Sequence, residues 1–161
     1  MRVYLATTPA RVAGLRADGI PVGTEAYAAT AALAEALGLP APGDPDTDDD
    51  LAEVAVATAA EASLLLLAED AAAGVDDPAP NRRVVLAADA RARPVDGDAH
   101  PGTVVLTAPL RFGSVDTVMA DDGTVPERVA RAVASVEWDQ ERAVRMLENT
   151  ALGWFDPSEL T

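Results

Sequence analysis

The sequence predicts one α/β domain, of the α+β kind, with a mixed sheet of about five strands flanked by helices. First, segments that favour strands alternate with segments that favour helices along the chain. Second, 161 residues suffice for one domain with its own core. Third, apolar residues make up 49% of the chain but aromatic residues only 4%, so Leu, Val and Ala must build the core. We expect residues 1–161 to form one domain, with residues 150–161 as a docked tail.

The N-terminal part is expected to hold two strand–helix units. Arg2–Thr7 is rich in residues that favour strands, and Thr8 and Pro9 then supply an N-cap and a first-turn proline. The helix that follows is expected to end at Gly19. Glu25–Thr30 is expected as a second strand, whose last residue caps another short helix. The first β-α-β step could be a right-handed parallel crossover.

The longest helix is expected at Leu51–Ala73, after the turn-rich acidic loop Pro40–Asp50. Asp49 or Asp50 is expected to cap it. Its apolar residues lie on more than one face, which is typical of a central, buried helix. Leu65 is therefore expected in the core, where its replacement by Ala would cost about 2–5 kcal/mol.

Two Val-Val-Leu segments, Arg83–Ala90 and Thr103–Ala108, are the strongest strand candidates. Their continuous apolar character predicts burial on both faces of a sheet. The loop Arg91–Gly102 suits a wide antiparallel connection between them. Val115–Ala120 alternates between apolar and polar residues, as a half-buried strand does.

Capping patterns in the C-terminal part of the sequence predict helices. Thr124 and Glu127 form a capping box ahead of one helix, and a second helical stretch is expected at about Asp139–Leu152. Asp156 and Glu159, with a proline between them, have the same capping-box spacing. They predict one terminal helical turn.

The chain is strongly acidic, with 12 basic residues, all Arg, against 27 acidic ones, for a net charge of −15. This charge disfavours binding to nucleic acid or to an anionic membrane. An acidic face could instead attract a basic partner, including a nucleic-acid-binding protein whose ligand it would imitate. The alternative is that the acidity reflects solubility and a coding bias toward GC-rich codons, which would also account for the lack of Lys.

The sequence predicts a soluble cytoplasmic protein. It opens MRVYLAT, without the basic and apolar regions of a signal peptide. Its longest notable apolar run, Leu64–Ala68, is far shorter than the ~20 residues of a membrane helix. The chain has no Cys, which agrees with a reducing compartment and excludes disulfides, thiol nucleophiles and thiolate metal sites.

Asp44, Asp46 and Asp48 match the first, third and fifth ligand positions of a calcium-binding loop. The glycine that such a loop needs next is Asp49, and the bidentate Glu of its twelfth position is Ala55. The pattern fails where geometry matters most. We therefore interpret the segment as a solvated acidic loop that caps a helix.

Asp96, Asp98 and His100 place three possible metal ligands at alternating positions, but the sequence offers no fourth ligand nearby. We predict no metal and no cofactor. The sequence also lacks a G-x-S-x-G nucleophile elbow, a G-x-G-x-x-G loop and a Walker motif. Lysine chemistry is excluded because there is no Lys, and we assign no catalytic residue.

One arrangement typical of enzymes remains. In open α/β sheets, ligands bind outside the carboxyl ends of the strands, near helix N-termini. Thr7, Thr30 and Asp89 lie at expected strand ends, and Arg111 could supply positive charge for an anion. In the alternative interpretation each Thr caps a helix and the Arg is solvated.

Trp154 and Phe155 stand adjacent near the C-terminus, in a chain with only six aromatic residues. They are a large apolar surface for so aromatic-poor a chain. We expect both rings to be buried, either because the tail docks back and seals the core or because they anchor a partner protein. Trp is enriched at the energetic centres of protein interfaces.

Three segments carry a resemblance to a known family: Met1–Leu5 (MRVYL), Arg82–Asp89 (RRVVLAAD) and Leu152–Leu160 (LGWFDPSEL). They resemble an uncharacterised family of small proteins from high-GC Gram-positive bacteria. In that family Trp-Tyr is more frequent where this chain has Trp154 and Phe155, so chemistry that needed the Tyr hydroxyl would be missing here. The resemblance implies no activity, cofactor or partner.

We therefore expect a non-enzymatic cytoplasmic protein that acts by association with another protein or with itself. The competing hypothesis is a small-anion or nucleotide-binding enzyme. A pocket lined by Thr7, Thr30, Asp89 and Arg111 would favour the enzyme. An exposed apolar patch or a symmetric interface would favour association.

Overall fold

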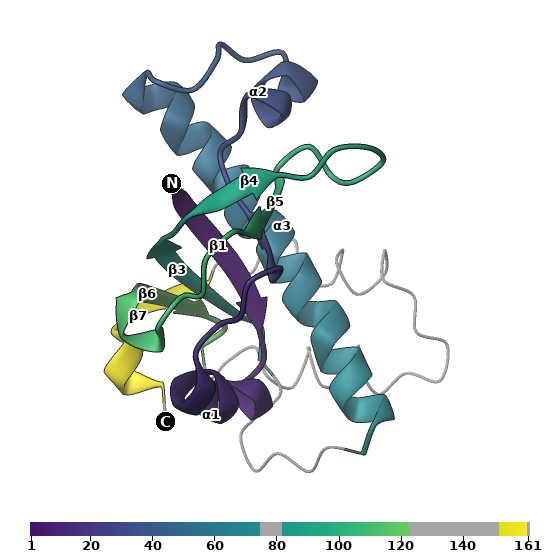
Figure 1. The fold of residues 1–161 in the computed structure, drawn as a ribbon, viewed down its shortest axis with the longest axis vertical. Coiled ribbons are helices and arrows are strands. Elements are labelled where there is room, and N and C mark those ends of the chain that lie inside the picture. Colours follow the sequence, from purple (N-terminus) through teal and green to yellow (C-terminus); the bar gives the residue numbers. More distant parts are fainter. Residues whose placement is uncertain (75–81, 123–151, 161) are drawn as a thin grey trace.

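The computed structural model describes residues 1–74, 82–122 and 152–160. In these residues three α-helices and one seven-stranded sheet form an α+β fold (Figure 1). All neighbouring strands in the sheet are antiparallel. The α+β class is confirmed, but the expected mixed sheet of about five strands is wrong in both strand number and direction.

The strand order is β4-β5-β2-β1-β3-β6-β7. The two central strands, β1 and β3, pair along six residues each, from Arg2 opposite Asp89 to Thr7 opposite Val84. The expected strands at the N-terminus and at 115–120 have the bounds that the sequence predicts, whereas β4 and β7 are additional short edge strands. The strands are β1 (Arg2–Thr7), β2 (Glu25–Tyr27), β3 (Val84–Asp89), β4 (Ala92–Pro94), β5 (Thr103–Leu106), β6 (Val115–Ala120) and β7 (Gly153–Phe155).

The first two strands are antiparallel, with Tyr4 opposite Tyr27, so the expected parallel crossover is wrong. Helix α1 (Pro9–Asp18) lies beyond the end of β1 and does not carry the chain back along the sheet (Figure 1). The return starts instead at Ile20, which forms an isolated antiparallel bridge with Leu110. A helix in this place can therefore be followed by an antiparallel neighbour.

The longest helix, α3 (Pro45–Ala72), begins six residues earlier than expected and crosses one face of the sheet (Figure 1). Asp44 is its N-cap, and the Asp44 carboxylate accepts a hydrogen bond from the Thr47 amide at 3.3 Å. The expected caps Asp49 and Asp50 lie inside the helix. Carboxylates near a helix N-terminus are stabilising, so the acidic run extends the helix rather than forming a loop before it.

The core lies on both faces of the sheet. On one face Tyr4 and Tyr27 pack against the small α3 residues Ala55, Ala59 and Ala60. The opposite face packs against α1 and the segment around residues 110–112. The five residues of β3 from 84 to 88 are fully buried, as its Val-Val-Leu sequence predicts. Ala on α3 permits the close approach that a core poor in aromatic residues requires.

Ser63 fastens α3 to the central strands. Its hydroxyl donates to the Thr7 carbonyl at 2.6 Å and accepts from the Val84 amide at 2.9 Å, and the residue is fully buried. Thr7 and Val84 face each other at the end of the β1–β3 ladder. One side chain thus joins the helix to both strands.

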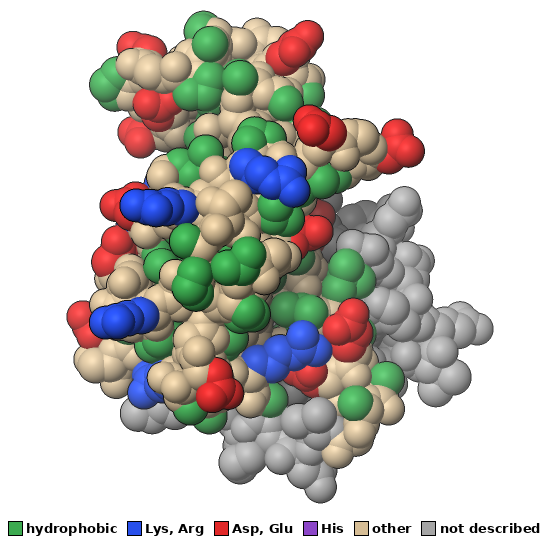
Figure 2. Space-filling view, in the orientation of Figure 1, with side chains coloured by type: hydrophobic (Ala, Val, Ile, Leu, Met, Phe, Trp, Pro, Cys, Tyr) green, Lys and Arg blue, Asp and Glu red, His purple; other side chains and the backbone are tan. Residues whose placement is uncertain are grey.

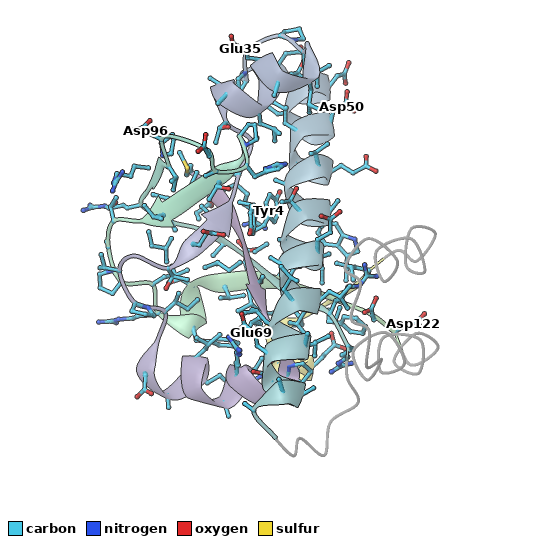
Figure 3. The ribbon with its side chains drawn as sticks, turned by 90° about the vertical axis from the view of Figure 1, so that its right-hand side faces the viewer. Tyr4, Glu35, Asp50, Glu69, Asp96 and Asp122 are labelled. Carbon is cyan, nitrogen blue, oxygen red and sulfur yellow. The ribbon has the colours of Figure 1, made fainter. Side chains whose placement is uncertain are left out.

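The C-terminal end of α3 is held to α1 by charged groups. The Thr8 hydroxyl donates to the Asp70 carboxylate at 2.6 Å, and the Arg11 guanidinium donates to the same carboxylate at 2.7 and 2.9 Å. Arg11 also donates to Glu69 at 3.2 Å. Figure 3 places Glu69 at the end of α3 beside α1. Asp70 holds the pKa of Arg11 above its usual value, which favours the ion pair.

By length and composition α3 could cross a membrane, a test that core helices of soluble proteins also pass. Its position along the sheet accounts for the apolar composition. Leu64 and Leu67 are buried, whereas Leu65 is half-buried. The helix turns Leu65 partly off the sheet, so the core position expected for it belongs to Leu64.

The C-terminal residues add β7 and a 3₁₀ turn, η2 (Pro157–Glu159), to the domain. The predicted capping box is confirmed: the Asp156 side chain accepts from the Ser158 amide at 2.8 Å, and Glu159 accepts from the Asp156 amide at 2.7 Å. The helices expected after Thr124 and at about 139–152 lie outside the described residues, apart from Leu152, which directly precedes β7.

Candidate functional site

The candidate site is the edge of the sheet formed by β7. In the described part of the chain this strand pairs with β6 alone, with Gly153, Trp154 and Phe155 opposite Ala120, Met119 and Val118. β7 therefore presents one backbone edge without a strand partner among those residues. Figure 1 shows it at the margin of the sheet, next to β6 and away from α3.

The two aromatic rings point to opposite faces, as adjacent residues on a strand must. Phe155 is partly buried and packs against the core on the α1 face of the sheet. Trp154 is opposite Met119, which belongs to the α3-side core, but its own side chain is 73% exposed. Of the two expected forms of burial, docking of both rings on their own domain is therefore wrong for Trp154, and burial against a partner stays a prediction.

The backbone of β7 is held firmly beneath the exposed ring. A Cβ atom at Gly153 would lie 3.0 Å from the Phe155 ring, so glycine lets that ring fold over the strand. Leu160 is buried in the core just after η2. Arg16 of α1 donates to the carbonyl oxygens of Pro157, at 2.7 Å, and of Leu160. Trp154 therefore projects from a fixed strand.

Two exposed carboxylates follow the strand directly. The Asp156 carboxylate accepts hydrogen bonds from the hydroxyl and the amide of Ser158, which lower the pKa of Asp156. Glu159 is also exposed. The guanidinium of Arg16, which lies beside this turn, donates to backbone carbonyls and lies 5.2 Å from the centre of the Phe112 ring. The C-terminal side of Trp154 is therefore negatively charged.

The residues proposed for an anion site are distributed over the two ends of the sheet. Thr7 pairs with Val84, whereas Asp89 pairs with Arg2 at the opposite end of the same ladder. In an antiparallel sheet the carboxyl ends of neighbouring strands lie alternately at the two opposite ends of the sheet. The rule for parallel sheets that suggested the site therefore does not apply to this fold.

Of these side chains, Thr30 is engaged in capping a helix, whereas Thr7 and Arg111 show no shared site. Thr30 caps α2 (Ala31–Leu37), where its hydroxyl accepts from the Leu33 amide at 3.0 Å and donates to the Pro101 carbonyl at 2.6 Å. The Thr7 hydroxyl is buried without a hydrogen-bond partner in the part of the chain that the structure describes. Arg111 is exposed next to the bridge residue Leu110.

The acidic segment at the start of α3 caps the helix. Asp44 is the N-cap, and Asp48 accepts a hydrogen bond from the Gly43 amide at 2.9 Å. Figure 2 shows carboxylates gathered at the end of the molecule where α2 and the start of α3 lie. Within residues 1–74, 82–122 and 152–160, no group of three or more Asp, Glu or His side chains is arranged to hold a metal ion.

The contacts of Tyr27 with Glu25 and His100 were not predicted from the sequence. Its hydroxyl donates to Glu25 at 2.9 Å, and its ring meets the exposed His100 edge-on at 6.5 Å between centroids. Burial, with the charges of Glu25 and Glu61, raises the pKa of Tyr27 well above its usual value. The Tyr27 hydroxyl therefore stays protonated, and able to donate, to a higher pH than that of an ordinary tyrosine. The alternation of Glu25 and Tyr27 along β2 was the available signal, because residues two apart share a face.

A buried ion pair joins β3 to the end of β6. The Arg83 side chain donates to the Asp121 carboxylate at 2.6, 3.0 and 3.1 Å, and the Arg83 amide donates to it at 2.9 Å. Asp121 is fully buried and Arg83 is 7% exposed. The pair is 38 residues apart in sequence, so no local pattern indicates it. It holds the sheet together at the end where β7 begins.

A family model matches residues 1–161, the whole chain. The chain belongs to DUF6912, a family of unknown function. Membership in DUF6912 supplies no activity, ligand or partner. Neither the curated proteins nor the solved structures include a significant match.

Proposed function

We propose that this DUF6912 member is a non-enzymatic cytoplasmic protein that acts by association with another protein, with Trp154 as the anchor. The observation that carries the proposal is the 73% exposure of Trp154 on an edge strand fixed by its neighbours. Single exposed aliphatic side chains such as Val22 are ordinary. An exposed Trp held on a fixed backbone is different, because it offers a large rigid surface at little entropic cost.

The competing hypothesis, a small-anion or nucleotide-binding enzyme, has less support. Thr7 and Asp89 lie at opposite ends of the sheet, and Thr30 caps a helix. Association of the chain with itself is the second form of the proposal. The net charge of −15 opposes it, because two copies would repel each other.

The cytoplasmic location and the bacterial source are part of the same proposal. The lack of Cys agrees with a reducing compartment. The absence of Lys and the abundance of Ala, Arg and Asp agree with a GC-rich genome, as in high-GC Gram-positive bacteria.

The test is affinity purification of the tagged chain from its native cells, followed by mass spectrometry. Wild-type protein is compared with Trp154→Ala and with Val22→Ala, a matched control that removes an exposed apolar side chain elsewhere. We expect at least one protein to copurify with the wild type and with Val22→Ala but not with Trp154→Ala. Identical sets of proteins from all three baits would contradict the proposal. Light scattering of the purified chain tests the self-association form.

A further inference from the structure

The two edges of the sheet differ in how they are protected. Edge strands expose unpaired backbone groups, and proteins commonly protect them with charge or proline. β4 has both, because it contains Arg93 and Pro94. β7, with the sequence Gly-Trp-Phe, has neither. Among the described residues, β7 is thus the edge where an extended segment of another chain could pair.

The charges beside β7 indicate what such a segment would carry. Trp154 and Asp156 are two residues apart, and the extended backbone of Asp156 continues the alternation, so both belong to the same face of the strand. Glu159 adds a second exposed carboxylate. The face of an indole ring attracts cations, Arg more often than Lys. Arg also pairs with carboxylates through two hydrogen bonds.

The whole-chain charge points the same way. At −15, the chain attracts basic partners over the Debye length and repels acidic ones, including its own copies. An edge strand, an exposed Trp and neighbouring carboxylates together match a basic extended peptide better than a second copy of this chain.

We propose that the partner presents an extended segment with Arg at alternating positions, which adds to the sheet as an eighth strand beside β7. One Arg lies over the Trp154 indole, and the next pairs with Asp156 and Glu159. Residues two apart along a strand lie on the same face, so Arg at alternating positions matches the spacing of Trp154 and Asp156. Cross-strand neighbours on one face are about 5 Å apart, which is within reach of an Arg side chain. This inference rests on the proposed function, since it names the chemistry of the partner at the same surface.

The experiment titrates the full chain carrying Trp138→Phe, so that Trp154 is the only indole, with the capped peptide Thr-Arg-Val-Arg-Val-Arg-Thr. Trp154 fluorescence is the first readout. Hydrogen exchange of the residue 153–155 amides in the wild-type chain is the second, and it needs no substitution. We expect saturable binding that weakens with salt, and protection of these amides.

Three comparisons decide the result. The double variant Asp156→Asn/Glu159→Gln, which keeps the acceptors of the η2 cap, should bind about tenfold more weakly. A peptide with Glu in place of Arg should not bind, and neither should the Arg peptide with alternate backbone amides N-methylated. Absence of binding by the Arg peptide would overturn the inference. So would equal binding of the N-methylated peptide, because attraction would then be charge alone. The proposed function is tested separately, and it fails if the copurifying proteins are insensitive to Trp154→Ala.

Discussion

Ser63 is the sharpest test of how α3 is fixed to the sheet. The Ser63→Ala substitution removes the bonds to the Thr7 carbonyl and the Val84 amide, at 2.6 and 2.9 Å, in a site that water does not reach. A buried backbone group that loses its partner costs about 1–3 kcal/mol. Two such groups, with some relaxation of the helix, give an expected loss of roughly 2–4 kcal/mol in the free energy of unfolding.

The assay is equilibrium unfolding in urea at neutral pH. Thr58→Ala is the matched control on the same helix, since among the residues that the structure describes the Thr58 hydroxyl bonds the Val54 carbonyl one turn back and no strand. That substitution should change the free energy of unfolding by less than about 0.5 kcal/mol, because Ala favours the helix and such back-bonding contributes little. A Ser63→Ala protein as stable as wild type would refute the packing of α3 described above.

Three further predictions concern stability. Asp121→Ala should lower the free energy of unfolding by about 3–5 kcal/mol in urea, because it leaves the buried Arg83 guanidinium without this carboxylate; a loss below about 1 kcal/mol would argue against the pair. Leu64→Ala should cost about 2–5 kcal/mol and Leu65→Ala clearly less, and the reverse order would contradict the face assigned to α3. Tyr27 has a pKa in the folded state above its unfolded value of 10.0, so its contribution is present below pH 10 and is lost as pH rises further. Tyr27→Phe should therefore lose less stability than wild type above that pH, and parallel alkaline unfolding curves would contradict the assignment.

Much of the fold could be predicted from the sequence because its signals are local. The bounds of β1 and β6 follow from residue preference and alternation, and the Asp156–Glu159 capping box follows from spacing alone. The direction of the strands has no such signal, since parallel and antiparallel strands share the same two-residue period. β4 and β7 are three residues each, too short for a period to be recognised.

The candidate site was only half predictable. The adjacent rings of Trp154 and Phe155 are notable in a chain with so few aromatic residues. Which ring is buried and which is exposed depends on the pairing of β7 with β6, which the sequence does not reveal. Strand geometry sends neighbours to opposite sides, so Phe155 faces the core on the α1 side, whereas Trp154 lies on the other face, at the margin of the sheet away from α3. The anion-site hypothesis assumed parallel strands, whose carboxyl ends meet at one end of a sheet. In the antiparallel sheet Thr7 and Asp89 lie at opposite ends instead.

The role of Trp154 in association is tested most directly by calorimetric titration of a protein recovered in the affinity purification. Wild-type chain and Trp154→Ala are titrated under the same conditions, after urea unfolding has established that their stabilities agree within about 0.5 kcal/mol, as expected for an exposed side chain. A binding anchor contributes about 2 kcal/mol or more, so Trp154→Ala should weaken binding roughly thirtyfold. Equal affinity of the two proteins would contradict the account.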